Sequence, residues 1–210
     1  MLRIGLVLLS ALAVLAVCAV SSSSALAAPN WVINGKEFTG SESVEGVSGL
    51  ADLEMTISGI KVTITCSVGK ATGTIKETNK DSSSAIKFTG CKVAEPSGCK
   101  TTEEIVTVET KTELEEEKTT GKVWDKYIPN TGEIFTTIPI EGCAVEGSYK
   151  VTGSARCEIQ SPKTEAIEKE CVFNKESGSK LKFGNVEADF LATFKTKLTG
   201  TNKGKVWTAV

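Results

Sequence analysis

The fold class is decided in residues 53–66, which read LEMTISGIKVTITC. Apolar and polar side chains alternate on both sides of Ser58-Gly59, and this dipeptide has the spacing of a two-residue hairpin turn. Alternation with a period of two puts one row of side chains on a core and the other in water, as in antiparallel sheets. The stretch therefore predicts a β-hairpin with one buried face.

The same pattern recurs through the rest of the chain. Asn34-Gly35 separates two further short runs, which is a strong hairpin signal. Helix signals are poor: the acidic residues 113–118 are better explained by an exposed strand than by a helical turn, and residues 80–84 are interpreted as a polar turn. We expect an all-β fold, an antiparallel β-sandwich or barrel of roughly twelve strands.

Two short segments resemble each other. Residues 86–91 read IKFTGC and residues 138–143 read IPIEGC, so that an alternating run ends in Gly-Cys in both. One interpretation is that two related β-rich halves, residues 28–100 and 101–210, make up the domain. The alternative is that Gly-Cys ends two strands by chance.

The first residues predict a secretory signal peptide. Arg3 precedes an apolar run over residues 4–20, and a serine-rich segment then leads to the small-x-small site at residues 25–27. We expect a signal peptide at residues 1–27 and a secreted, extracellular all-β domain at residues 28–210. A membrane anchor is the alternative, because the apolar run is at the lower limit of roughly 17–25 residues for a span.

Lipid anchoring is disfavoured, although Cys18 lies in a lipobox-like context. An acylation box needs a small residue before the cysteine, and Val17 is not small. Cys18 would then leave with the signal peptide.

The remaining cysteines are even in number, which in an exported chain predicts three disulfides. Cys157 and Cys171 stand on two runs separated by a turn at residues 161–163, so we expect them to pair. A zinc site is disfavoured by the wide spacing and by the absence of histidine. The six candidates are Cys66, Cys91, Cys99, Cys143, Cys157 and Cys171.

Two pairings are open for the other four cysteines. Cys91 and Cys99 flank the turn at residues 96–98, which favours a local Cys91–Cys99 bond and leaves Cys66–Cys143 to close a long loop. The alternative is Cys66–Cys91 with Cys99–Cys143.

Several short segments carry a resemblance. Residues 31–35 read WVING, 65–66 TC, 88–91 FTGC, 95–99 EPSGC, 141–143 EGC and 205–207 KVW. In this order they resemble an uncharacterised family of secreted, cysteine-containing β-rich proteins of high-GC Gram-positive bacteria. The resemblance implies an exported β-rich protein and supplies no activity, substrate or binding residues. Cys157 and Cys171 lie outside the pattern of this resemblance, which implies that they form a local cross-link and not a shared functional element.

The composition excludes several kinds of chemistry. The 210 residues contain no histidine, so neither a Ser-His-Asp nor a Cys-His pair can form. Arg156 is the only arginine outside the predicted signal peptide, and no glycine-rich nucleotide loop follows a strand. The sequence therefore predicts no catalytic, cofactor-binding or metal-binding residues, and no cofactor.

Charge and hydropathy bear on partners. The 24 basic and 26 acidic residues are mixed, without the basic cluster that a nucleic-acid partner needs. No second apolar segment is long enough to span a membrane after signal cleavage. The partner stays open, with a component of the cell envelope as one possibility.

Tryptophan is the remaining candidate for ligand contact. Trp124 lies between Lys122 and Lys126 and is the best candidate for a partly exposed ligand platform. Trp31 and Trp207 lie near the two termini, where we expect them to cover the ends of the domain.

Three functions fit these observations. The first is a non-catalytic secreted or cell-surface β-domain protein that binds a partner or has a structural role in the envelope. The second is a β-barrel carrier of a small apolar ligand, which predicts inward aromatic rings around a cavity. The third is a carboxylate-based secreted hydrolase, which predicts two buried or cleft-facing acids with raised pKa values.

Overall fold

The computed structural model describes residues 29–77 and 80–210, and these residues are all-β. They form seventeen strands and one short 3-10 helix, η1 (Lys175–Ser177). The strands are β1 (Trp31–Ile33), β2 (Lys36–Glu37), β3 (Ser41–Ile57), β4 (Ile60–Cys66), β5 (Val68–Lys76), β6 (Lys80–Ser83), β7 (Lys87–Thr89), β8 (Lys92–Glu95), β9 (Glu104–Val106), β10 (Thr110–Glu117), β11 (Lys122–Pro129), β12 (Ile134–Ile140), β13 (Gly147–Ile159), β14 (Glu168–Phe173), β15 (Lys180–Phe183), β16 (Val186–Leu198) and β17 (Trp207–Ala209).

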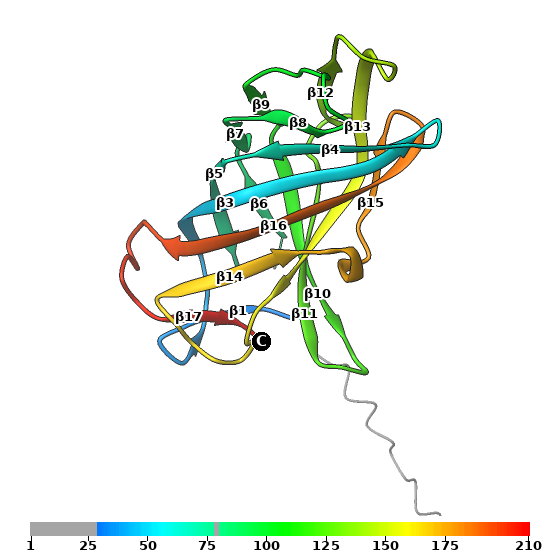
Figure 1. Ribbon diagram of the computed structural model, residues 1–210. Helices are drawn as coiled ribbons and strands as arrows, with labels where there is room; N and C mark the ends of the chain where they lie inside the picture. The colour runs from blue at the N-terminus through cyan, green and yellow to red at the C-terminus, as the bar shows by residue number, and fades with distance from the viewer. Residues whose placement is uncertain (1–28, 78–79) are drawn as a thin grey trace, which may run out of the picture.

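Eight of the strands close an antiparallel barrel, in the order β3-β16-β14-β13-β11-β10-β6-β5 and back to β3 (Figure 1). The ring closes because β3 is long enough to change partners along one edge. Its residues 41–48 pair with β5 and its residues 51–57 pair with β4. Of the two all-β architectures left open by the sequence, the chain adopts the barrel.

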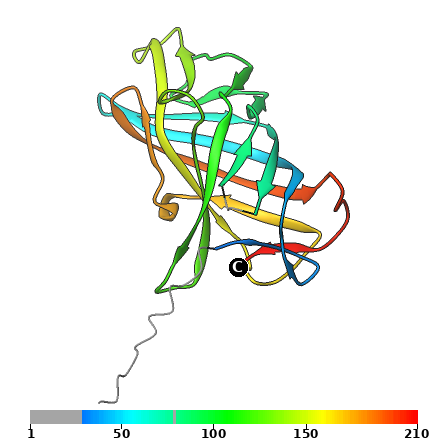
Figure 2. The ribbon, with the colours of Figure 1, turned by 180° about the vertical axis from the view of Figure 1, so that it is seen from behind.

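A small separate sheet, in the order β17-β1-β2, lies at one end of the barrel, which is the lower end in Figures 1 and 2. It joins the two ends of the described chain, since Trp31 is opposite Ala209 and Ile33 is opposite Trp207. The rings of Trp31 and Trp207 are 5.2 Å apart, and both side chains are buried. They cover an end of the domain, as expected, and it is the same end for both.

The other strands extend the sheet at the opposite end. The edge of β3 continues through β4 to β8, and β5 continues through β7 to β9. Strand β12 pairs with β13, while β15 lies between β13 and β16. Figure 1 shows β4, β8, β9 and β12 together above the barrel. With these additional strands the total is seventeen, compared with the roughly twelve that the sequence predicts.

The local predictions are confirmed for both hairpins and for the acidic segment. Asn34-Gly35 and Ser58-Gly59 are the turns between β1 and β2 and between β3 and β4, each with positive φ angles. Residues 113–117 belong to strand β10. The interpretation of residues 80–84 as a turn is wrong, because residues 80–83 pair with β10 as strand β6.

Three disulfides are present, and Cys157–Cys171 is one of them, as expected. The favoured pairs Cys91–Cys99 and Cys66–Cys143 are wrong, and the alternative, Cys66–Cys91 with Cys99–Cys143, is observed.

Strand register gives the physical reason for this correction. Thr65 is opposite Lys92 in the β4–β8 pair, which places the next two residues, Cys66 and Cys91, face to face. An isolated bridge between Lys100 and Glu141 brings the segments that carry Cys99 and Cys143 side by side. Both cysteines of the expected local pair therefore lie opposite partners on other segments.

Each proposed half contributes one continuous arc of the same barrel. Strands β3, β5 and β6 come from residues 28–100, and β10, β11, β13, β14 and β16 come from residues 101–210. Neither range closes a barrel by itself, and whether the two are related stays a hypothesis. The predicted signal peptide and Cys18 lie outside the described residues.

Candidate functional site

The barrel interior contains a short polar row in an otherwise apolar core. Strands β6, β10 and β11 are neighbours, and their register places Asp81 opposite Thr112 and Thr112 opposite Tyr127. Asp125 lies two residues before Tyr127 on β11 and therefore faces the same side of the sheet. Three strands thus bring two carboxyl groups, a threonine and a tyrosine together.

Strand alternation explains why these polar groups are buried. On β11 the inward positions are Val123, Asp125 and Tyr127, so the two residues next to Asp125 on this face anchor the strand in the core. Asp81 is 5% exposed and Asp125 is 7% exposed. Asp125 is therefore held inside the barrel by the apolar residues of its own strand, and Asp81 by the pairing of β6 with β10.

Each oxygen of Asp81 accepts one hydrogen bond. Its Oδ2 atom accepts a hydrogen bond from Trp31 Nε1 at 2.7 Å, and its Oδ1 atom accepts one from the backbone N–H of Lys76 at 2.6 Å. The first bond ties the small β17-β1-β2 sheet to the polar row. Trp31 therefore covers the barrel end and orients one of its two acids.

Asp125 is partnered on one side only. Hydrogen bonds from the hydroxyl groups of Tyr127 and Thr112 act on its carboxylate. Its Oδ1 atom is buried and has no hydrogen-bond partner among the described residues. An unsatisfied buried acceptor costs about 1–3 kcal/mol, so this oxygen is a place where a donor from outside the chain would be stabilised.

Burial dominates the electrostatics of the row. It raises the pKa of Asp81 to about 7, with the Asp125 charge adding to the effect and the bonds from Trp31 and Lys76 opposing it. Burial also raises the pKa of Asp125 to about 6, against the bonds from Tyr127 and Thr112. The same burial and the Asp125 charge raise the pKa of Tyr127 well above its usual value. The pair therefore titrates close to neutral pH.

A cavity of about 70 Å³ lies against this row. Since one water molecule needs roughly 10–15 Å³ measured in this way, the cavity has room for several waters or for a small polar group. It reaches from the tryptophan end to the middle of the barrel. Its walls include Trp31, Asp81, Asp125, Tyr127, Phe173 and Trp207.

A second cavity, of about 90 Å³, lies further along the barrel and is apolar. Tyr127 and Phe173 line both cavities, and their rings are 5.6 Å apart. Together with Ile86, which also lines both cavities, these two side chains separate a polar from an apolar compartment. Further walls of the apolar compartment include Leu53, Phe88, Phe135, Ala155 and Phe190.

Lys169 on β14 also lines the polar cavity, but its ammonium group is used elsewhere. Its Nζ atom donates to the backbone oxygens of Ser161 and Thr164, at 2.8 Å and 3.0 Å, in the β13–β14 loop. Burial lowers the pKa of this side chain. Lys169 thus anchors a loop, and no described ion pair joins it to the two acids.

The sequence predicted none of these site residues. The polar composition of residues 80–84 indicates a turn and gives no sign that Asp81 faces inward, and Asp81 and Asp125 are far apart in the chain. One local signal was present: Asp125 stands in phase with Val123 and Tyr127, on the side of an alternating run where an apolar residue is expected.

Trp124 is not the partly exposed platform that the sequence suggested. It is 4% exposed and lies on the outer face of β11, outside the main core cluster. Lys122 Nζ and Arg156 Cζ are 5.4 Å and 4.8 Å from its ring centroid. The expectation is wrong because the chain's own cations cover the ring, as cations do over the face of an indole.

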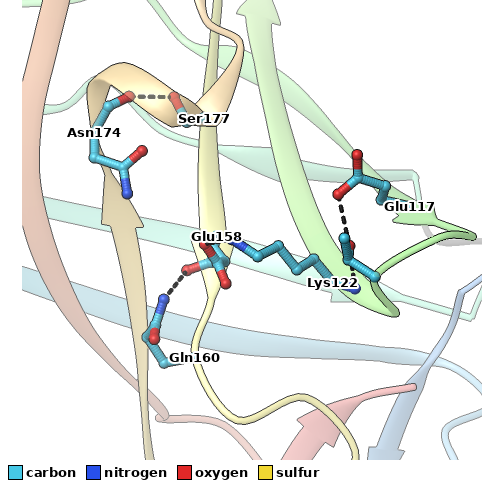
Figure 3. Close-up of polar contacts among 7 residues, drawn as sticks. Glu117, Lys122, Glu158, Gln160, Asn174 and Ser177 are labelled. Carbon is cyan, nitrogen blue, oxygen red and sulfur yellow. Dashed lines mark hydrogen bonds and ion pairs between the residues drawn. The ribbon is translucent and has the colours of Figure 1, made fainter.

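These cations are held in place by acids on neighbouring strands. Arg156 Nε is 3.1 Å from Glu115 Oε2, and Lys122 pairs with Glu158 at 3.0 Å. Figure 3 shows the Lys122–Glu158 pair between β11 and β13, near the turn that Ser177 closes by donating to the Asn174 carbonyl. Two cations, each paired with an acid, therefore shield the ring of Trp124 from solvent.

We expect Arg156→Ala to destabilise the protein by about 1 kcal/mol, because it removes both the cover of Trp124 and the ion pair with Glu115. Urea unfolding of the oxidised protein measures the change, and the tryptophan emission maximum should move to longer wavelength. The control is Lys150→Ala, which changes an exposed residue on β13. A change no larger than the control's would contradict the assignment.

Comparisons with protein-family models, with curated proteins and with solved structures find no significant match. The resemblance to secreted proteins of high-GC Gram-positive bacteria stays a prediction.

Proposed function

We propose that this protein is a secreted, non-catalytic binding protein that holds a small ligand inside its barrel. The observation that carries the proposal is the pair of adjoining cavities in the interior of a closed barrel. An eight-stranded barrel is just wide enough to be filled by side chains or to hold one small ligand. Here the side chains leave two spaces, and one of them is lined by Asp125, whose Oδ1 atom is a buried acceptor without a partner among the described residues.

The character of the walls supports a ligand that is partly apolar. Phe88, Phe173 and Phe190 line the second cavity, which matches the inward aromatic rings expected of a carrier. Both cavities are smaller than the roughly 150 Å³ apolar cavity that accepts benzene. We therefore expect a ligand with a short body, of about four carbon atoms.

Three disulfides support the extracellular part of the proposal, because such bonds persist in oxidising compartments. The predicted signal peptide at residues 1–27 supports it from the sequence. In residues 29–77 and 80–210, no helix has the length and apolar character of a membrane span.

We expect 1-butanol to bind to the oxidised protein and to raise its melting temperature. Ala155→Leu should weaken this binding at least tenfold, because Ala155 lines the apolar cavity and the larger side chain fills it. Ala94→Leu is the matched control, since Ala94 is exposed on β8. Titration calorimetry measures both. Equal binding to the two variants, or no binding to the native protein, would contradict an interior site.

A carboxylate-based hydrolase is a second candidate, and one observation favours it. Asp81 and Asp125 are both buried, and burial raises both pKa values, to about 7 and about 6. The cavity beside them has about 70 Å³, which is small for a sugar ring placed between two carboxyl groups. Release of nitrophenol from a panel of nitrophenyl glycosides and esters, lost in Asp125→Asn, would support this candidate over simple binding.

A further inference from the structure

We propose that the ligand is a small primary amine in its ammonium form, bound between Asp81 and Asp125 with its apolar body against Tyr127 and Phe173. This inference rests on the proposed function, because it names the chemical class of ligand for the same interior site. Its first support is charge. Two acids share one buried cavity, and none of the ion pairs among the described residues includes either of them.

The nearby cations of the chain do not neutralise this pair. Lys169 lines the cavity, but its ammonium group donates to the carbonyls of Ser161 and Thr164. Lys76 is exposed, and its charge is the weakest of the influences on Asp81. A buried charge without a partner is costly, so a cation from outside the chain would be strongly favoured here.

Hydrogen bonding gives the second, independent support. Asp125 lines the cavity, and its Oδ1 atom is a buried acceptor with no partner among the described residues. An ammonium group brings three donors and no acceptor. One donor can satisfy Asp125 Oδ1, and another can reach Asp81, whose oxygens still have free lone pairs.

The walls favour an organic cation over a metal ion. The cavity is lined by the rings of Trp31, Tyr127, Phe173 and Trp207, and aromatic faces attract ammonium groups. Metal sites need more hard ligands than two carboxylates. In the described part of the chain, no group of three or more histidine, cysteine, aspartate or glutamate side chains could hold a metal ion.

The position of the apolar cavity indicates the size and direction of the apolar part of the ligand. Tyr127 and Phe173 border both cavities, so a ligand whose head is at the acids has its body directed toward these two rings. The volumes of about 70 Å³ and 90 Å³ favour a short aliphatic chain. Butylamine has this size and is the probe of choice.

The acids make binding depend on pH. An ammonium ion binds best when both carboxyl groups are ionised, and the raised pKa values of Asp81 and Asp125 mean that both are mostly protonated at pH 5. Binding should therefore be tighter at pH 8, where butylamine is still cationic. The other titratable groups around the pair are Lys76 on β5, Glu115 on β10, Tyr127 on β11, and Lys169 and Glu170 on β14.

The test compares butylamine with 1-butanol, its neutral analogue, by titration calorimetry on the oxidised protein. At pH 8 we expect the amine to bind at least tenfold more tightly than the alcohol, and at least tenfold more tightly than it does at pH 5. Asp125→Asn should weaken the amine at least tenfold and change the alcohol less than threefold. Asp189→Asn, which changes an acid whose side chain is 49% exposed, should change neither.

The outcomes separate this inference from the proposed function. If the alcohol binds as tightly as the amine and Asp125→Asn affects both equally, the barrel binds apolar molecules and the amine inference is wrong. If neither molecule binds, the proposed function fails and the inference fails with it. Asp81→Asn is the second variant, and retention of full amine affinity in both variants would also overturn the inference.

Discussion

Raising the pH from 5 to 8 is expected to lower the free energy of unfolding by about 4 kcal/mol, because Asp81 and Asp125 must ionise inside the barrel. Their pKa values in the folded protein are about 7 and about 6, against an ordinary value of 3.8. An acid whose pKa is raised by folding contributes stability below its ordinary pKa, and this stability is lost as the pH rises through the raised value. For each acid, the free energy of unfolding falls by about 1.4 kcal/mol for every pH unit between pH 5 and its raised pKa. This interval is about two units for Asp81 and about one unit for Asp125.

Histidine and the surface ion pairs do not account for this slope. The chain has no histidine, and the lowered pKa of Glu95 falls below its ordinary value of 4.5. The exposed ion pairs, such as Lys61 with Glu95, are formed throughout the range. Urea unfolding of the oxidised protein at pH 5, 6, 7 and 8 measures the slope directly. A stability that is flat or rises over this range would contradict the burial of the two acids.

The Asp125→Asn variant separates the contribution of Asp125 to the pH dependence of stability from that of Asp81. The amide is nearly isosteric, its oxygen can keep the bonds from Tyr127 and Thr112, and its nitrogen replaces the unpartnered Oδ1. At pH 8 we expect this variant to be more stable than the native protein by about 2 kcal/mol, since one buried charge is gone. It should also flatten the pH dependence, because the charge of Asp125 helps to raise the pKa of Asp81.

The control for this variant is Asp189→Asn, at the exposed acid near Lys175. A surface carboxylate of this kind contributes within about 0.5 kcal/mol, so the control should follow the native protein at every pH. If Asp125→Asn were less stable than the native protein at pH 8, an unidentified cation would have to neutralise Asp125 in the protein as isolated.

Gly153→Ala is expected to destabilise the protein by about 4 kcal/mol, and it is the largest single-residue effect that we predict. Gly153 is at φ +102°, a conformation in which side chains are strained. A Cβ atom at this position would also overlap the backbone carbonyl oxygen of Lys180 on β15. Neither backbone can move away, because Gly153 is opposite Leu181 in the β13–β15 pairing.

The location of Gly153 on β13 explains why the substitution should also disturb the barrel wall. Residues 151–154 of β13 pair with β15, whereas residues 155–159 pair with β11 and β14 in the barrel wall. A displaced Gly153 would disturb the junction between the barrel and the strands above it. Urea unfolding measures the loss. The matched control is Gly49→Ala on β3, where the φ angle is ordinary and a Cβ atom would meet nothing; equal effects at both sites would contradict the argument.

Much of the local structure could be predicted from the sequence, because alternation and turn chemistry depend on neighbours along the chain. Both Asn34-Gly35 and Ser58-Gly59 are hairpin turns, and the all-β class follows from the same runs. The Cys157–Cys171 disulfide was predictable, since the turn between two adjacent strands limits where they can pair. The other two disulfides were not, because they depend on which strand lies beside β4 and β12.

The sequence by itself determined that the chain forms alternating strands with one buried face and that its cysteines pair. Only the tertiary structure decided that β3 pairs with both β5 and β16, which closes the barrel and gives it an interior. The pairing of β6, β10 and β11 places Asp81 and Asp125 at the same cavity, although they are far apart in the chain. It also leaves Trp124 on the outside under Lys122 and Arg156. The reason is physical: the side of a strand that faces a ligand depends on long-range register, and register is a property of pairs of strands.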